Sequence, residues 1–318
     1  MKNSYFKKLL KGDIATLAQS ITLIESSLYL DKKKANDLID KCLKIKNDSF
    51  RIAVSGIPGV GKSTFINALL KNLINLNKKV AILTIDPSSS KSKGSILADK
   101  TRMTNVSGNK NIFIRPSPSK GKLGGISNKT RQSIILCETA GFDIIIIETT
   151  GVGQTEMTAK EMTDFFILLT MPNSGDQLQA IKKGIVEIAD LIVINKIDTL
   201  TELNILKEKN YYSQIKNTKK HNYQKIQTCS SKKGIGLDNI CSILTNNYTL
   251  QKQTGKLDKN RINQIKYWLN ESIQEILLEK FYSQKKIQKE ILKITKEIKE
   301  KNVNVDKLSK KLVDKYLK

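Results

Sequence analysis

The chain has 318 residues, with 55 Lys or Arg against 30 Asp or Glu and a formal net charge of +25. This length can bury a large core, and it fits one large α/β domain with helical additions, or two domains. No apolar run reaches the roughly 18 residues that a membrane helix needs, and the Lys-rich start MKNSYFKKLLKGD lacks the cleavage site of a signal peptide. We therefore expect a cytoplasmic protein that does not associate with a membrane.

The large positive charge raises the question of nucleic acid. Only five of the basic residues are arginine, the residue best suited to bidentate recognition of phosphates and guanine edges, and the lysines are spread along the chain. We expect weak, salt-sensitive adsorption to polyanions and no specific nucleic-acid site. The four cysteines form no CxxC pair, and the chain has only one histidine, which is too few ligands for a zinc or redox site. We therefore expect reduced, structural thiols.

The pattern along the chain divides it into three parts. Residues 4 to 46 have apolar residues at helical spacing, such as Leu17, Ile21, Ile24 and Leu28, and predict two or three helices. All five prolines and thirteen of the seventeen glycines lie between residues 56 and 184, where we expect the shaped turns and the chemistry. The sequence predicts an N-terminal helical segment (1–48), an α/β domain (49–250) and a C-terminal helical extension (251–318).

Short apolar runs alternate with helical stretches in the middle part. Continuous apolar runs indicate strands buried on both faces, as in a mostly parallel sheet flanked by helices. Ligands bind such sheets beyond the carboxyl ends of the strands, and each motif below follows one of these runs. The runs are IAVS, VAILTID, IFIRP, DIIIIE, FFILLT, LIVIN and IQTCS.

The first run leads into GIPGVGKST, residues 56–64, which satisfies GxxxxGK[ST], the pattern of a phosphate-binding P-loop. Its glycines allow backbone N–H groups to turn toward phosphate oxygens, and the following helix directs its positive end at them. Lys62 would neutralise the β and γ phosphates, and the Ser63 hydroxyl would bind Mg²⁺. The loop residues predicted to contact the nucleotide are Gly56, Gly59, Val60, Gly61, Lys62, Ser63 and Thr64.

NKID, residues 195–198, ends another apolar run. The carboxylate of Asp198 could accept hydrogen bonds from N1–H and the 2-amino group of guanine, while Asn195 and Lys196 would brace the loop and cover the ring. Helix N-caps use the same residue types, but the position after a P-loop and at a strand end favours GTP or GDP over ATP. CSSKKG at the next strand end adds Ser230 and Ser231, whose loop could offer a backbone N–H to guanine O6.

IIIIETTGVGQTE is the third motif. Switch GTPases usually place DxxG after this strand, and here Glu148 stands for the acid, with Gly151 three residues later. We expect Glu148 to hold Mg²⁺ through water and the Gly151 N–H to sense the γ-phosphate. Gln154 could position the attacking water, by analogy with other GTPases, or simply cap the next helix.

Taken together, these motifs resemble the MeaB/ArgK-type GTPases, the group that includes the methylmalonyl-CoA mutase-associated GTPase. The likeness spans about residues 50 to 245 and includes the unusual Glu148. It also rests on the quoted segments VAILTIDPSSSKSKGSILADKTRM, FIRPSPSKGKLGG and MPNSGDQLQAIKKGIVEIADLIVINKID. RPSPSKGKLGG could contact nucleotide or partner, or could be only a solvated turn cluster.

The resemblance implies a SIMIBI-type GTPase, with an extra parallel strand beside the P-loop strand. It implies a chaperone that gates adenosylcobalamin loading and protection of a cobalamin-dependent acyl-CoA mutase, hydrolysing GTP slowly until the mutase binds. Asp86 and Asp99 carry over as acids around Mg²⁺ with Ser63 and Glu148, and Lys62, Glu148 and Asp99 as catalytic residues. Residues 172–183 match an extra switch that faces the mutase.

Several positions depart from the family pattern on these switch and base loops. The nucleotide-binding residues are intact, so the departures bear on the partner. They are Lys93, Ala98, Asn173, Gln177, Ala180 and Ser231.

Two other functions share these motifs. One is a kinase linked to a periplasmic lysine/arginine/ornithine transport system, because relatives have been described as such kinases; it would need an acceptor site with a general base. The other is a nickel metallochaperone GTPase, which needs Cys or His ligands near the nucleotide, in a chain with one histidine.

The tail has apolar residues at helical spacing from Ile262 to Leu312, with a heptad pattern from Ile291 onward. Such a stripe packs against its own GTPase domain or against a second chain. The resemblance favours the second arrangement, a homodimer formed through the C-terminal helices.

Overall fold

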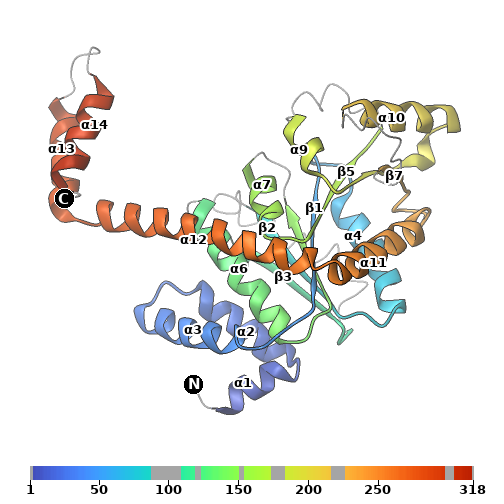
Figure 1. Ribbon diagram of the computed structural model, residues 1–318, viewed down its shortest axis with the longest axis horizontal. Coiled ribbons are helices and arrows are strands. Elements are labelled where there is room, and N and C mark those ends of the chain that lie inside the picture. The colour runs from blue at the N-terminus through green and yellow to red at the C-terminus, as the bar shows by residue number, and fades with distance from the viewer. Residues whose placement is uncertain are drawn as a thin grey trace. The chain divides into compact units, whose positions relative to one another are not determined.

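The computed structural model describes residues 3–86, 109–118, 123–149, 154–172, 183–215, 226–297 and 304–316. The chain forms two compact units, residues 1–264 and 265–318 (Figure 1). In the described part, no helix is long and apolar enough to cross a membrane. Its four cysteines are buried and have free thiols.

A seven-stranded sheet forms the centre of the first unit (Figure 1). Its order is β3-β2-β4-β1-β5-β6-β7, and every pair of neighbours is parallel. All seven expected runs are strands, which confirms the predicted P-loop type of α/β sheet. The strands are β1 (Phe50–Ser55), β2 (Val80–Asp86), β3 (Ile112–Pro118), β4 (Ile144–Thr149), β5 (Phe165–Thr170), β6 (Leu191–Ile194) and β7 (Ile226–Thr228).

Both faces of the central strands are covered, which explains their continuous apolar sequences. On one face, Val54 of β1 and Ile146 of β4 belong to the same apolar cluster as residues of α4 (Lys62–Asn75) and α11 (Leu237–Gln253). The alternate residues Ile145 and Ile147 point to the other face and are also fully buried. Helices that contact the strands include α6 (Leu123–Thr139), α7 (Gln154–Lys160) and α9 (Lys183–Ile188).

The N-terminal part forms three helices, at the upper end of the prediction: α1 (Asn3–Leu10), α2 (Ile14–Glu25) and α3 (Tyr29–Cys42). The Asp13 side chain caps α2 by accepting the Thr16 N–H at 2.8 Å. Leu17, Ile21 and Ile24 have the predicted helical spacing along α2, and all three are buried. The prediction was wrong for Leu28, because α2 ends at Glu25 and Leu28 lies in the following loop, 66% exposed.

Helical segments complete both units. The 3₁₀ turn Ile197–Thr199 and α10 (Glu202–Ile215) follow β6, and α12 (Lys256–Tyr282) follows α11. The second unit contains the rest of α12, then α13 (Lys285–Glu297) and α14 (Val305–Tyr316). Within it, Ile287 is fully buried, and Lys315 and Tyr316 of α14 bind the carboxylate of Glu290 on α13. The predicted division at residues 48 and 250 stays a prediction.

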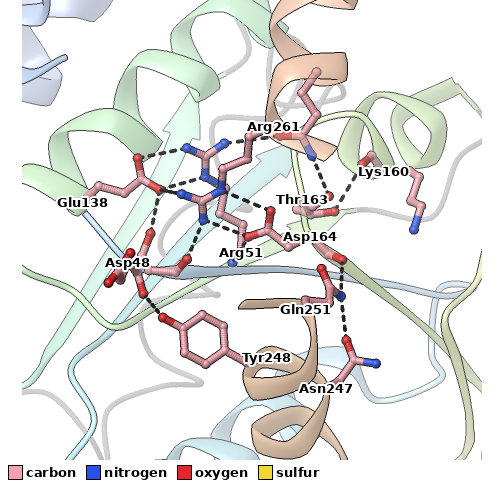
Figure 2. A network of polar contacts seen from close by, with 12 residues as sticks. Asp48, Arg51, Glu138, Lys160, Thr163, Asp164, Asn247, Tyr248, Gln251 and Arg261 are labelled. Atoms are coloured by element: carbon pink, nitrogen blue, oxygen red, sulfur yellow. Dashed lines mark hydrogen bonds and ion pairs between the residues drawn. The ribbon is translucent and has the colours of Figure 1, made fainter. Parts of the chain in front are cut away.

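A buried charge network lies at the amino ends of β1 and β5 (Figure 2). Arg51 binds both carboxylate oxygens of Glu138 on α6, through Nε at 2.8 Å and Nη2 at 2.9 Å. Arg261 of α12 donates from Nη2 to Asp164 Oδ2 at 3.0 Å and to the Ser49 carbonyl at 2.5 Å. The network therefore joins α6, the amino ends of two central strands and the first turns of α12, at the end of the sheet away from the P-loop.

Candidate nucleotide site

The loop between β1 and α4 has a shape that requires glycine. Gly59 and Gly61 have φ values of 80° and 95°, in the left-handed region that favours glycine. A Cβ at Gly56 would lie 2.3 Å from the Leu169 carbonyl oxygen, and one at Gly61 would lie 2.9 Å from Asn195 Nδ2. The backbone of β5 at Leu169 thus leaves no room for a side chain at Gly56, and the Asn195 side-chain amide crowds the position at Gly61.

Lys62 begins α4 and folds back over this loop. Its Nζ donates to the carbonyl oxygens of Gly56 at 2.7 Å and Ile57 at 3.2 Å. Burial lowers the pKa of Lys62, and the nearby carboxylates of Glu148 and Glu156 oppose that shift. An ammonium group held over a glycine-rich loop at a helix N-terminus suits phosphate.

Ser63, in the first turn of α4, contacts the end of β4. Its Oγ donates to Glu148 Oε1 at 3.0 Å. A hydroxyl and a carboxylate oxygen so close together are ligands that Mg²⁺ prefers, so these residues fit the metal predicted there. Among the described residues, no group of three or more His, Cys, Asp or Glu side chains could hold a metal.

Other predicted residues lie at or beyond the limits of the described structure. Asp86 is the last residue of β2, and its side chain is not among those described. Thr64 lies in the first turn of α4 and is exposed. The predictions for Asp99, Gly151 and the departures Lys93, Ala98, Asn173, Gln177 and Ala180 fall outside the described residues. Gln154 is the first residue of α7.

The NKID loop is bound to the P-loop. Asn195, which is 2% exposed, donates from Nδ2 to the Val60 carbonyl at 3.0 Å. Its Oδ1 accepts from both the N–H and the hydroxyl of Ser231, at 3.0 Å and 2.8 Å. Lys196 donates from Nζ to the Gly59 carbonyl at 2.8 Å. Asn195, at the end of β6, therefore joins the P-loop after β1 to the loop after β7 by hydrogen bonds on both sides.

Strain and charge mark the same loop. Lys196 has φ 61°, a left-handed conformation that is uncommon for a residue with a side chain. Asp198 is exposed, and a hydrogen bond from the Ser230 side chain is the main cause that lowers its pKa. Lys233 and Lys232 add a smaller effect in the same direction. The carboxylate is thus ionised and accessible at neutral pH, as an acceptor for a base edge must be.

Sequence reasoning missed Glu156, in the first turn of α7. This carboxylate is 2% exposed, and its charge acts on the pKa of Lys62. The residue stands within the quoted motif GVGQTE. The available signal was an acid in the first helical turn after the predicted switch loop, where a helix N-terminus favours negative charge.

The parallel sheet, the glycine loop with Lys62 and the NKID loop bound to it define a P-loop nucleotide-binding fold. A family model described as "Methylmalonyl Co-A mutase-associated GTPase MeaB" matches residues 17–286. The chain belongs to this family. The match extends beyond residues 50–245 and includes flanking helices on both sides.

Individual relatives agree with this assignment. GTPase ArgK of Escherichia coli is 39% identical over 281 residues, covering 87% of this chain and 85% of that protein. The mouse "Methylmalonic aciduria type A homolog, mitochondrial" is 38% identical over 299 residues, covering 89% of this chain and 72% of that protein. A putative GTPase of Caulobacter vibrioides is 50% identical over 191 residues, 60% of this chain and 59% of its own length.

A solved structure has the same fold. The crystal structure of an LAO/AO transport system kinase superposes with a TM-score of 0.75 and 29% sequence identity, covering 99% of this chain and 97% of that one. The predicted family and the predicted enzyme class, a GTPase, are confirmed. Guanine-nucleotide binding follows from membership of this family.

Proposed function

We propose that this GTPase is a chaperone that gates cofactor loading and protection of a cobalamin-dependent acyl-CoA mutase such as methylmalonyl-CoA mutase. The observation that carries the proposal is the match over residues 17–286 to a family described by its association with that mutase. The mouse relative, named for methylmalonic aciduria, supports the same role. Slow hydrolysis without the partner would let the bound nucleotide report whether a mutase is engaged.

Each loop has a role in this proposal. Lys62 and the P-loop N–H groups bind the phosphates, and Asp198 accepts from guanine while Asn195 and Lys196 hold its loop in place. Ser63 and Glu148, whose oxygens are 3.0 Å apart, would hold Mg²⁺ together with Asp86 and Asp99. When bound, Mg²⁺ would neutralise charge that develops on the β and γ phosphates. Further assigned nucleotide contacts are Gly56, Gly59, Val60, Gly61, Thr64, Gly151, Ser230 and Ser231.

The second unit supports an oligomeric form of the proposal. The apolar side chains along α12 remain exposed, including Ile265, Leu269 and Ile276 at 59%, 60% and 51%. A second copy of the chain would cover them, so we propose a cytoplasmic homodimer formed through the C-terminal helices.

Nucleotide-dependent capture of the mutase tests the function. Purified chain, immobilised with GDP, with a non-hydrolysable GTP analogue or without nucleotide, is incubated with methylmalonyl-CoA mutase. We expect retention to depend on the nucleotide, and the mutase to accelerate hydrolysis of GTP. Equal retention in all three states together with unchanged hydrolysis would contradict the proposal.

A matched variant controls for adsorption by this basic chain. Asp198→Asn should lose capture with the GTP analogue and recover it with the xanthosine analogue, because the new amide donates to the 2-oxygen of xanthine. The kinase alternative predicts a different product. If the γ-phosphate label accumulates on a periplasmic amino-acid-binding protein instead of appearing as inorganic phosphate, phosphoryl transfer is the better description.

A further inference from the structure

Two buried hydroxyl side chains join β1 and β4 beneath the P-loop. Thr149 Oγ1 donates to Ser55 Oγ at 2.9 Å, and each residue is 1% exposed. Ser55 is the last residue before Gly56, where the loop begins. Thr149 directly follows Glu148 and ends β4. The contact therefore connects the last residue before the phosphate loop to the last strand residue before the predicted second switch.

This contact and the Ser63 contact lie on opposite faces of the sheet. Val54 and Glu148 are paired in the parallel register of β1 and β4, and successive residues of a strand alternate between faces. Glu148 accepts from Ser63 of α4 on one face. Thr149 and Ser55 therefore meet on the other face, so hydroxyl groups on both sides hold the end of β4 against the P-loop segment.

Packing does not require hydroxyl groups at these two positions. The three residues before Ser55 on β1, Ile52 to Val54, and the three before Glu148 on β4, Ile145 to Ile147, are apolar and fully buried. A neutral hydrogen bond adds little net stability, and replacing both partners by apolar groups of similar shape is nearly neutral. Unlike an apolar contact, the bond is directional, and it adds a side-chain link just beyond the backbone pairing that ends at Val54 and Glu148.

We propose that Ser55 and Thr149 are positioning residues for GTP hydrolysis. Their hydrogen bond holds the end of β4, and with it the Glu148 carboxylate, in a set position relative to the phosphate loop. The inference deepens the proposed function, since it rests on the assignment of Glu148 and Ser63 to Mg²⁺. Neither residue need touch the nucleotide for this role.

The test compares variants of the full chain that remove or retain the bond. Thr149→Val and the double variant Ser55→Ala/Thr149→Val remove it, and Thr149→Ser retains a hydroxyl. Thr170→Val is a matched control at the end of β5, since Thr170 is also 1% exposed but its hydroxyl has no hydrogen-bond partner among the described residues. Single-turnover GTP hydrolysis without mutase, GDP affinity, Mg²⁺ dependence and melting temperature are measured for each.

We expect the double variant to melt near the wild-type temperature, to bind GDP within about twofold of wild type, and to hydrolyse GTP about tenfold more slowly. It should also need more Mg²⁺ for half-maximal rate. Thr149→Ser should recover most of the rate, and Thr170→Val should match the wild type. A wild-type rate in the double variant would overturn the inference, as would a rate loss matched by equal losses of GDP affinity and melting temperature.

A reference variant separates failure of this inference from failure of the assignments beneath it. If Glu148→Ala hydrolyses GTP normally, the metal assignment is wrong and the positioning role falls with it. If Glu148→Ala hydrolyses GTP slowly while the double variant hydrolyses it at the wild-type rate, only the positioning role of the hydroxyl pair is wrong. Because the assay contains no mutase, the result is independent of the partner proposal.

Discussion

Replacing Glu138 by Gln should destabilise the first unit strongly. The side chain is 9% exposed and accepts three hydrogen bonds, two from Arg51 and one from the Ser49 hydroxyl at 2.6 Å. Glutamine keeps the shape of the side chain but turns one acceptor into a donor that faces a guanidinium. The buried charge of Arg51 then loses the carboxylate of Glu138. Removing one partner of such a pair costs about 3–5 kcal/mol in the free energy of unfolding.

The assay is urea unfolding followed by circular dichroism, with a thermal melt beside it. For a unit of this size, the loss corresponds to a drop of roughly 10 °C in melting temperature. Asp48→Asn is the matched control, because it breaks the Lys252 ion pair at 2.7 Å, whose side chains are 52% and 56% exposed, and should change little. The compensated variant Arg51→Met/Glu138→Leu should recover most of the loss, since apolar pairs often replace buried ion pairs without penalty.

A Glu138→Gln protein within about 1 kcal/mol of wild type would refute this reasoning, because it would mean that the buried guanidinium needs no carboxylate. A double variant as unstable as the single one would place the effect in packing. Either result would show that the charge of Glu138 does not contribute the stability assigned to it.

Four further outcomes follow from the structure. Asp198→Asn should prefer XTP over GTP in a competition titration by a factor of at least about ten, and a retained GTP preference contradicts the base assignment. Lys62→Ala should weaken nucleotide binding, whereas Glu148→Ala should bind GDP normally yet hydrolyse GTP poorly and lose its Mg²⁺ dependence; normal turnover would exclude a role for this acid. Burial alone would raise the pKa of the Glu138 carboxyl, but Arg51 lowers it below its ordinary value of 4.5. The contribution of Glu138 to the free energy of unfolding should therefore be complete above that ordinary value and be lost as the pH falls through the lower folded-state pKa, which acid titrations of unfolding would measure. Removing residues 265–318 should give a monomer that still binds GTP, because this cut keeps the first turns of α12 in the buried network. Light scattering measures the mass of both forms, and a full-length monomer or a truncated dimer would contradict the proposed interface.

Local sequence determined the strands and the nucleotide loops. The seven apolar runs are strands, and GIPGVGKST follows β1 as its pattern requires. These features could be predicted because they depend on neighbouring residues: a glycine at a left-handed φ, an apolar run long enough for a buried strand, an acid at a strand end. The family resemblance rests on the same kind of information, since order and spacing of motifs are properties of the chain itself.

Only the tertiary structure decided which of these residues meet. Lys196 reaches the carbonyl of Gly59, 137 positions away, and Arg51 reaches Glu138, 87 positions away. In the sequence, Arg51 was merely a basic residue at the start of an apolar run, and Glu156 was one more acid in a helix. Their partners depend on strand order and on how helices cross the sheet, and local periodicity carries no information about either. A charge can be buried where the fold brings an opposite charge to it, and that meeting is a property of the folded chain.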